Sequence, residues 1–178
     1  MDRRQDHKAL IMPVENERKY VLPTDFSPGR LEGWTRFDIL QAYLDDGPRI
    51  RQIDADYLFT YKRWIPQAQE LIEIETALSA EDFDLLWPLR VESVQKTRYV
   101  KEIGDAEWVV DFLKDGAGRV YFVLAEVEMP RHQASPGDLP GEIRDHVLYA
   151  VGAGDNGFTN KKLSNPDYAA KLYRRLGE

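Results

Sequence analysis

Charged side chains recur at every second position in most candidate strands of this chain, and this alternation constrains the fold more than any other feature. Successive side chains of a strand point to opposite faces of a sheet, so a period of two places both members of a pair on one face. The pairs are of like sign, and acidic pairs alternate with basic pairs along the chain. The pattern therefore predicts a mainly β protein in which most strands carry one charged face. The charged positions are Glu15/Glu17 followed by Lys19, then Arg49/Arg51, Lys62 two residues after Thr60, Glu73/Glu75, Lys96/Arg98 and Glu126/Glu128.

The opposite positions of these strands are largely apolar, as at Ile72 and Ile74. Two arrangements fit such strands, and the alternation alone does not choose between them. An ordinary sheet would pack its apolar face inside and leave the charges in water. A closed barrel would enclose the charged face and cover its apolar outside with helices. The like-sign pairing, which is unfavourable on a plain solvated face, and the isolated Asp111 within an apolar strand both favour the second arrangement.

Proline, glycine and capping residues divide the chain into about eight strands and a few helices. This tally favours a mainly β (α+β) fold, built as an antiparallel barrel or sandwich. No linker separates two domains, so we expect a single domain over residues 12–178, after a flexible extension over 1–11. The expected strands cover 14–22, 37–44, 49–53, 57–64, 70–77, 93–101, 107–113 and 120–129, and the expected helices cover 80–87, 142–150 and 166–176.

Composition narrows the classes of function. The 178 residues are 43% hydrophobic and 31% charged, as in a soluble globular protein, and the net charge of −7 argues against nucleic acid or an anionic membrane as a general partner. The chain has no cysteine and only three histidines, which excludes disulfides and thiolate sites and disfavours a zinc centre. No apolar run reaches transmembrane length. A cytoplasmic location is the expectation.

The stretch from Glu15 to Lys19 suggests a specific chemistry. As a strand it would place two carboxylates and one ammonium group on the same face. Adjacent carboxylates suit a hard divalent cation, and a nearby lysine can bind a phosphate oxygen on the same metal. The alternative is a solvent-exposed charged strand, which an isolated stretch of this kind would favour. The charged pairs on the other strands decide between these two interpretations. They favour the metal site, because a charged lumen needs a polyanionic ligand with bridging cations.

The motifs ExExK, RxR, TxK, ExE, KxR, D and ExE, taken in this order, resemble those of the CYTH superfamily, the triphosphate tunnel metalloenzymes. The resemblance is closest to their short bacterial inorganic tripolyphosphatases. The chain departs from the family at three places: Leu40 stands where arginine is common, Ala42 replaces a glycine, and residues 152–157 are glycine-rich where the family usually carries a charged run. Further matching segments are Gln41-Ala42-Tyr43-Leu44 with QGYL, Lys96-Thr97-Arg98-Tyr99 with KTRY, Leu124 to Glu128 with LVEVE, and Phe158 to Leu163 with YxNxxLA.

The resemblance implies an eight-stranded antiparallel closed barrel, a triphosphate tunnel, with a few outer helices. It implies that Lys96 and Tyr43 take part in activating the attacking water. It also implies Mg2+ or Mn2+ as cofactor, with Glu73 and Glu75 as additional acidic residues of variable role. The implied metal ligands are Glu15, Glu17, Asp111, Glu126 and Glu128. The implied triphosphate-binding residues are Lys19, Arg49, Arg51, Lys62, Lys96 and Arg98.

The activity expected from this resemblance is metal-dependent hydrolysis of tripolyphosphate to pyrophosphate and phosphate. One alternative is another enzyme of the same fold, either a class IV-type adenylate cyclase or a thiamine- or nucleoside-triphosphatase. A further alternative is a module that binds polyphosphate without catalysis. The expected partner is a small polyanion, with neither nucleic acid nor membrane, and a homodimer is left open.

Overall fold

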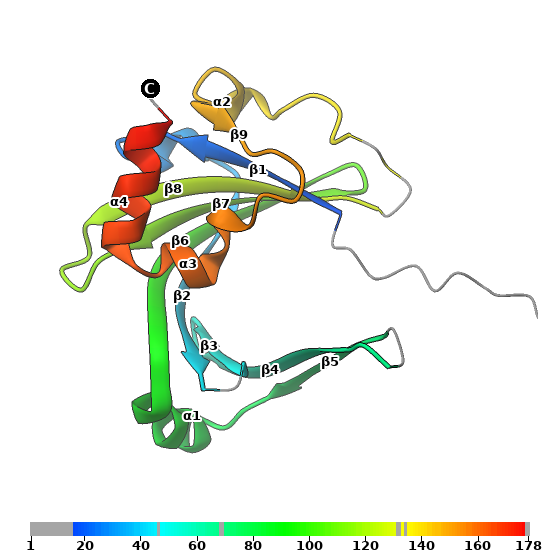
Figure 1. Ribbon diagram of the computed structural model, residues 1–178. Coiled ribbons are helices and arrows are strands. Elements are labelled where there is room, and N and C mark those ends of the chain that lie inside the picture. Colours follow the sequence, from blue (N-terminus) through cyan, green and yellow to red (C-terminus); the bar gives the residue numbers. More distant parts are fainter. Residues whose placement is uncertain (1–15, 46, 68–69, 131–132, 134, 177–178) are drawn as a thin grey trace, which may run out of the picture.

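The computed structural model describes residues 16–45, 47–67, 70–130, 133 and 135–176. The predicted extension over 1–11 and the predicted metal ligand Glu15 lie outside the described residues. The described strands form one antiparallel sheet of nine strands in the order β5-β4-β3-β2-β6-β7-β8-β1-β9 (Figure 1). Their bounds are β1 Glu17–Leu22, β2 Thr35–Leu44, β3 Arg49–Ile53, β4 Asp56–Ile65, β5 Glu70–Ala77, β6 Arg90–Ile103, β7 Ala106–Lys114, β8 Val120–Glu128 and β9 Tyr149–Ala150.

The sheet is open, so the predicted closed barrel of eight strands is not what the structure shows. Strand β5 forms one edge and β9 the other, and each of these edge strands pairs with a single described neighbour. The helix predicted over 142–150 ends early, as α2 (Gly141–Arg144), and the chain then runs extended through β9. Because β9 pairs with Tyr20 and Val21, it occupies the edge of β1 at which a closing strand would pair.

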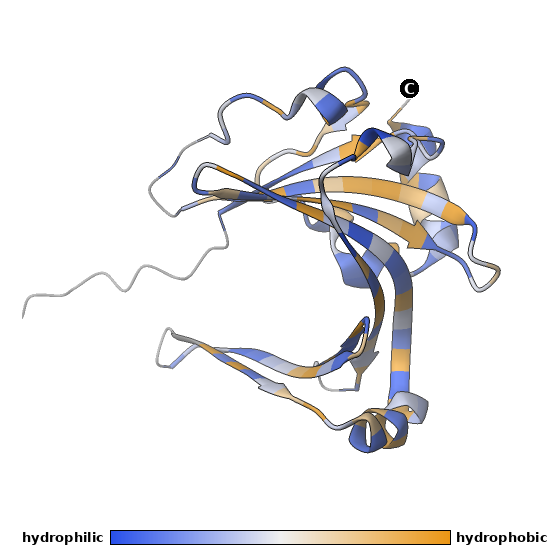
Figure 2. Ribbon diagram, turned by 180° about the vertical axis from the view of Figure 1, so that it is seen from behind, coloured by the Kyte–Doolittle hydropathy of each residue, from blue (hydrophilic) through white to orange (hydrophobic). Residues whose placement is uncertain are grey.

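The sheet curls through the long strands β6 and β2, so that β3, β4 and β5 turn back beneath β7 and β8 (Figures 1 and 2). The convex side of β7 and β8 is apolar and carries the first core cluster, which includes Trp108, Phe112 and Val127. Phe26 from the loop after β1 and Ile143 from α2 cover this cluster. Burying side chains of this size stabilises a fold by about 1.5–3 kcal/mol each.

The concave side changes character along the strands. At one end it is apolar, where Leu113, Phe122 and Leu124 pack against Phe158 and Leu163 of the C-terminal region. Here the short helix α3 (Asn160–Leu163) and the helix α4 (Pro166–Arg175) cover the sheet. Further along the same faces the residues are charged. The structure therefore encloses charged side chains within the curve of the sheet, as the second arrangement required.

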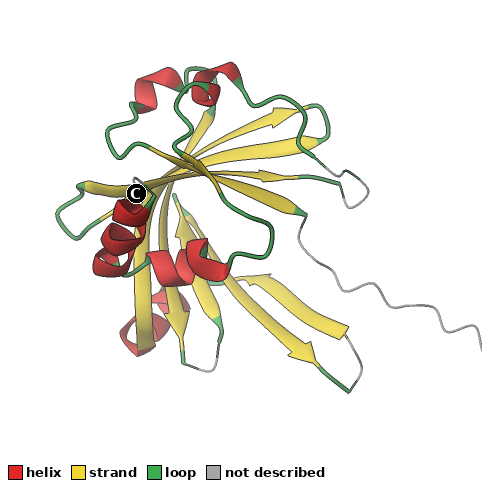
Figure 3. Ribbon diagram, turned by 45° about the horizontal axis from the view of Figure 1, so that its top comes forward, coloured by secondary structure: helices red, strands yellow, loops and turns green. Residues whose placement is uncertain are grey.

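The remaining helices lie at the margins of the sheet (Figure 3). Helix α1 (Ala80–Leu86) begins at Ser79, whose side chain accepts a hydrogen bond from the Asp82 backbone as an N-cap. Its Phe83 packs with Ile50 in a third apolar cluster beneath β2 and β3. Three short 3-10 helices cover Pro28–Arg30, Trp87–Leu89 and Asn156–Phe158. None of the described helices has the length and apolar character needed to cross a membrane.

Candidate functional site

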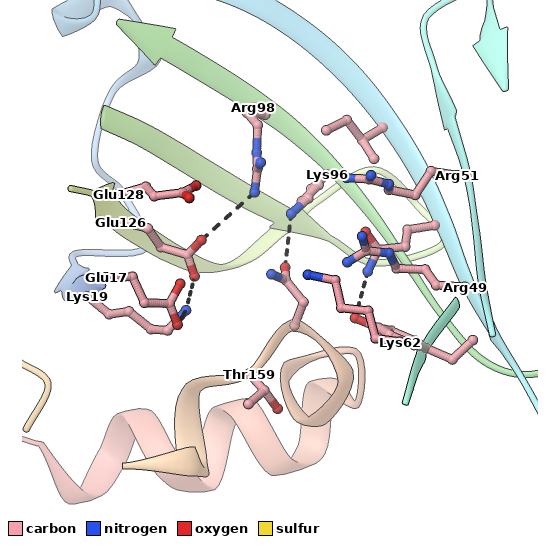
Figure 4. Close-up of a pocket in the computed structure, with 14 residues that line it drawn as sticks. Glu17, Lys19, Arg49, Arg51, Lys62, Lys96, Arg98, Glu126, Glu128 and Thr159 are labelled. Atoms are coloured by element: carbon pink, nitrogen blue, oxygen red, sulfur yellow. Dashed lines mark hydrogen bonds and ion pairs between the residues drawn. The ribbon is translucent and has the colours of Figure 1, made fainter. Parts of the chain in front are cut away.

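A cavity of about 330 Å³ lies on the concave face of the sheet (Figure 4). Strands from both halves of the sheet and the C-terminal helix α3 contribute to it, and almost every lining residue is polar or charged. The cavity brings together residues predicted as metal ligands with residues predicted to bind a triphosphate. The described lining residues are Glu17, Lys19, Ile39, Gln41, Tyr43, Arg49, Arg51, Lys62, Lys96, Arg98, Glu126, Glu128, Thr159 and Asn160.

One wall of the cavity is acidic and comes from β1 and β8. The antiparallel register places Glu17 opposite Glu128 and Lys19 opposite Glu126. The Lys19 ammonium lies 3.0 Å from the Glu17 carboxylate and also pairs with Glu126. Burial works to lower the pKa of Lys19, but the two carboxylates, Glu126 above all, raise it. Lys19 therefore stays charged and offsets the repulsion among the carboxylates around it.

The other wall is basic and comes from β3 and β4, with Arg49, Arg51 and Lys62. Arg51 donates to Glu75 at 2.7 Å, and Lys62 lies 3.0 Å from Glu73. The predicted acidic pair of β5 therefore contacts the basic wall, and neither member is among the lining residues of the cavity.

The two arginines of the basic wall do not use all of their hydrogen-bond donors within the described part of the chain. Within the described part of the chain, the buried Nε atoms of Arg49 and Arg51 have no hydrogen-bond partner. Burial and the neighbouring Arg49 charge lower the pKa of Arg51. Nearly all buried polar groups in native proteins have hydrogen-bond partners, so these two donors are available to water or to the oxygens of a bound anion.

The centre of the site is a group of three charges, in which Asp111 and Lys96 are buried and Arg98 is partly exposed. Asp111 is fully buried and accepts from Arg98 Nε and Nη2, both at 2.7 Å, and from Lys96 Nζ at 2.6 Å. Burial alone would raise the pKa of Asp111, but Lys96 and Arg98 hold it well below its usual range. Its oxygens thus face two cations, and Asp111 is not among the lining residues of the cavity. Its role as a metal ligand stays a prediction.

Lys96 is 2% exposed and lines the cavity from β6. Burial is the largest influence on this group and lowers its pKa to about 8, with a smaller contribution from Arg98 in the same direction. Besides Asp111, its Nζ donates to Asn160 Oδ1 at 2.9 Å. A lysine with a lowered pKa inside a charged cavity is a candidate for proton transfer.

Tyr43 lines the cavity from β2, the strand that pairs with β6. Its hydroxyl accepts a hydrogen bond from Gln41 Nε2 at 2.6 Å, and burial raises its pKa. The Lys161 ammonium lies 5.8 Å from the centre of the Tyr43 ring, within the range of a cation–π contact.

The acidic wall has the donor chemistry of a divalent-cation site, because carboxylate oxygens suit Mg2+ and Mn2+. As the described side chains lie, however, no group of three or more acidic or histidine residues converges on one point that could hold a metal ion. Lys19 holds two of the three carboxylates. The donor set therefore fits such a cation. Glu17, Glu126 and Glu128 would bind it once the ion pairs of Lys19 with Glu17 and Glu126 are broken.

Sequence reasoning missed several lining residues. Ile39 and Gln41 follow from the β2 alternation that also gives Tyr43, so the period of two could have found them. Thr159 and Asn160 had only a weak signal, the resemblance of residues 158–163 to a family segment. Their place in the cavity depends on how α3 packs on β6, which no local pattern reveals.

Comparisons with known proteins add little to this description. No protein-family model and no curated protein matches the chain. The PH1012 protein of Pyrococcus horikoshii is 14% identical, with 90% of this chain and 88% of that chain covered and a TM-score of 0.47. A conserved hypothetical protein of Pyrococcus furiosus is 13% identical, with 90% and 89% covered and a TM-score of 0.47. A "putative adenylate cyclase" of Bacillus halodurans is 19% identical, with 65% and 80% covered and a TM-score of 0.42. At these identities and TM-scores the likenesses carry no argument about function.

Proposed function

We propose that this protein is a CYTH-type enzyme that hydrolyses inorganic triphosphate to pyrophosphate and phosphate with the help of Mg2+ or Mn2+. The observation that carries the proposal is the cavity itself, in which an acidic wall faces a basic wall that holds two buried arginine donors without partners. A linear polyanion with bound divalent cations satisfies both walls at once. A single-charge ligand would leave one of them uncompensated.

The chain's residues would divide the work as follows. Arg49, Arg51 and Lys62 bind phosphate oxygens and neutralise charge that develops on the departing pyrophosphate. Glu17, Glu126 and Glu128 hold the cation, which when bound would offset phosphate charge and acidify a water molecule. Lys96 and Tyr43 line the cavity from the paired strands β6 and β2 and are proposed to orient the attacking water in line with the scissile bond.

The lining favours inorganic triphosphate over a nucleotide. A nucleobase needs an apolar or aromatic surface on which to stack, and among the described lining residues only Ile39 and Tyr43 offer one. The Lys161 ammonium lies over the Tyr43 ring and competes for the same surface. We therefore place tripolyphosphate ahead of ATP and thiamine triphosphate as the substrate.

A substrate panel tests this proposal. The full-length protein is incubated with tripolyphosphate, ATP or thiamine triphosphate, each with Mg2+, with Mn2+ and with a chelator. We expect metal-dependent release of one phosphate and one pyrophosphate per tripolyphosphate, with slower turnover of the other two compounds. Formation of cyclic AMP from ATP would assign the protein to the cyclases instead. Tight binding of tripolyphosphate without turnover would make it a non-catalytic binding module.

A further inference from the structure

We infer that Asn160 is a substrate-binding residue whose carboxamide is held by Lys96 so that its Nδ2 group donates to the polyanion. The inference rests on the proposed function for its ligand, an inorganic triphosphate. It concerns binding, however, and does not require that the bound compound is hydrolysed.

Asn160 is presented by a firmly anchored element. It is the first residue of α3, where the Thr159 hydroxyl caps the helix by accepting from the Lys162 backbone N–H at 3.3 Å. The helix is fixed to the sheet at its other end, because Leu163 is fully buried and its carbonyl accepts from the Tyr121 hydroxyl at 2.8 Å. The position of the Asn160 side chain is therefore set by packing outside the cavity.

The contact with Lys96 fixes which end of the carboxamide faces which way. An ammonium group has donors only, so the atom that lies 2.9 Å from Lys96 Nζ must be the carboxamide oxygen. The Nδ2 group then occupies the other side of the amide. No described residue accepts a hydrogen bond from Nδ2, and Asn160 lines the cavity. Two N–H donors are thus left for a ligand.

The Asn160 carboxamide is an uncharged hydrogen-bond donor in a cavity that already holds several cations. Lys96, Arg98 and Arg51 already bring positive charge to the cavity, and the pKa of Arg51 is lowered by burial first and then by the charges of Arg49 and Arg98. Another cation would add repulsion and destabilise the ligand-free protein. A carboxamide instead provides hydrogen bonds to phosphate oxygens at no such cost. Hydrogen bonds to a charged group contribute enough to change affinity by at least about tenfold.

Two substitutions test whether Asn160 contacts the bound anion. Asn160→Asp keeps an oxygen for Lys96 but replaces the two donors with an anionic oxygen. Asn160→Ala removes both functions. We measure the binding of tripolyphosphate to the full-length protein by titration calorimetry without added divalent metal. We expect a loss of about tenfold in affinity for the alanine variant and a larger loss, about 100-fold, for the aspartate variant. Wild-type affinity in Asn160→Asp, or a smaller loss in it than in Asn160→Ala, would overturn the inference.

The matched control is Asn165→Asp, the same chemical change at the N-cap of α4. Aspartate caps a helix as well as asparagine does, so this variant should bind tripolyphosphate like the wild type. Thermal unfolding shows whether each variant is folded. Should Asn160→Asp fail to fold, the isosteric Asn160→Leu takes its place, and unchanged affinity in that variant overturns the inference. Wild-type protein that binds tripolyphosphate but does not hydrolyse it would defeat the proposed reaction and leave the role of Asn160 standing.

Discussion

At the scale of single residues, Asp111 is the most constrained group in the site. The resemblance assigned it to the metal, whereas in the structure its carboxylate holds Arg98 in a two-pronged contact and Lys96 beside it. An acidic residue in an apolar strand was the sequence signal for a buried site, and the burial is confirmed. The two cations that contact it could not be read from the sequence, because they come from the neighbouring strand β6.

We predict that Asp111→Asn destabilises the fold strongly. The substitution removes the carboxylate that the buried Lys96 and the partly exposed Arg98 share, and breaking a buried ion pair in this way costs about 3–5 kcal/mol. The free energy of unfolding in urea measures the effect. Asp105→Asn, the same chemical change at an exposed residue in the turn before β7, serves as the control and should cost less than about 1 kcal/mol. A loss below about 1 kcal/mol in Asp111→Asn would show that the three charges do not depend on one another.

For Arg49→Met we predict little or no loss of stability but a loss of affinity for tripolyphosphate. The arginine brings a buried Nε without a partner into the ligand-free protein, and its charge lies close to that of Arg51. Methionine fills similar space without either cost, so the unfolding free energy should stay within about 1 kcal/mol of wild type or rise. Affinity for tripolyphosphate should fall by about tenfold or more, because one anion-binding group is lost. A clear loss of stability with unchanged affinity would make Arg49 a structural residue.

At the scale of elements, the strands were the part of the fold that could be predicted from the sequence. The predicted spans 49–53 and 70–77 coincide with β3 and β5, because alternation and turn residues mark both ends of such strands. The prediction of a helix over 142–150 was wrong beyond Arg144, where α2 ends. Its apolar residues repeat like those of a helix, yet Leu148 is half-exposed and its backbone donates to Val21 of β1. A long-range pairing with β1 thus decided the local structure.

The alternation by itself could not tell which face of the strands is enclosed; only the like-sign pairing and the isolated Asp111 favoured the charged face. Alternation gives two faces but not their surroundings, and those depend on how the sheet curls. The hairpin of β4 and β5 shows the limit of the pattern, because Ile72 and Ile74 lie on its apolar face and are nevertheless exposed in the described chain.

Helix α2 gives a pH-dependent prediction at this scale. Glu142 accepts from Lys101 at 2.8 Å and from the Trp34 indole at 3.3 Å, contacts that tie α2 to the sheet. The Lys101 contact lowers the pKa of Glu142 below its ordinary value of 4.5. Since the folded-state pKa is the lower one, the stabilisation is fully present above pH 4.5 and is lost as the pH falls through the folded-state value.

We therefore expect Glu142→Gln to lower the melting temperature at pH 7 by a small amount, corresponding to at most about 1 kcal/mol for this partly exposed pair. The difference from wild type should shrink as the pH is lowered below 4.5. Thermal unfolding of both proteins over a series of pH values measures it. A difference that is constant with pH would show that the Glu142 charge does not hold α2 in place.

At the scale of the whole molecule, the open, curled sheet brings two walls of opposite charge to one cavity. The acidic wall comes from β1 and β8, next to one edge of the sheet, and the basic wall comes from β3 and β4, next to the other. A chain with net charge −7 can thus present a local basic surface to a polyanion. In the sequence this arrangement appears as charged pairs of like sign, because neighbouring strands of one wall carry charges of the same sign.

The central claim is that this cavity carries out metal-dependent hydrolysis, and the rate of phosphate release from tripolyphosphate at increasing Mg2+ tests it most directly. Wild type is compared with Glu126→Gln and Glu17→Gln, and with Glu102→Gln as a control, because Glu102 is exposed on β6 and is not a lining residue of the cavity. We predict losses of about 100-fold or more in the first two variants. The control should stay within about twofold of wild type. Wild-type rates in Glu126→Gln and Glu17→Gln, or a wild-type rate that does not depend on the metal, would contradict the claim.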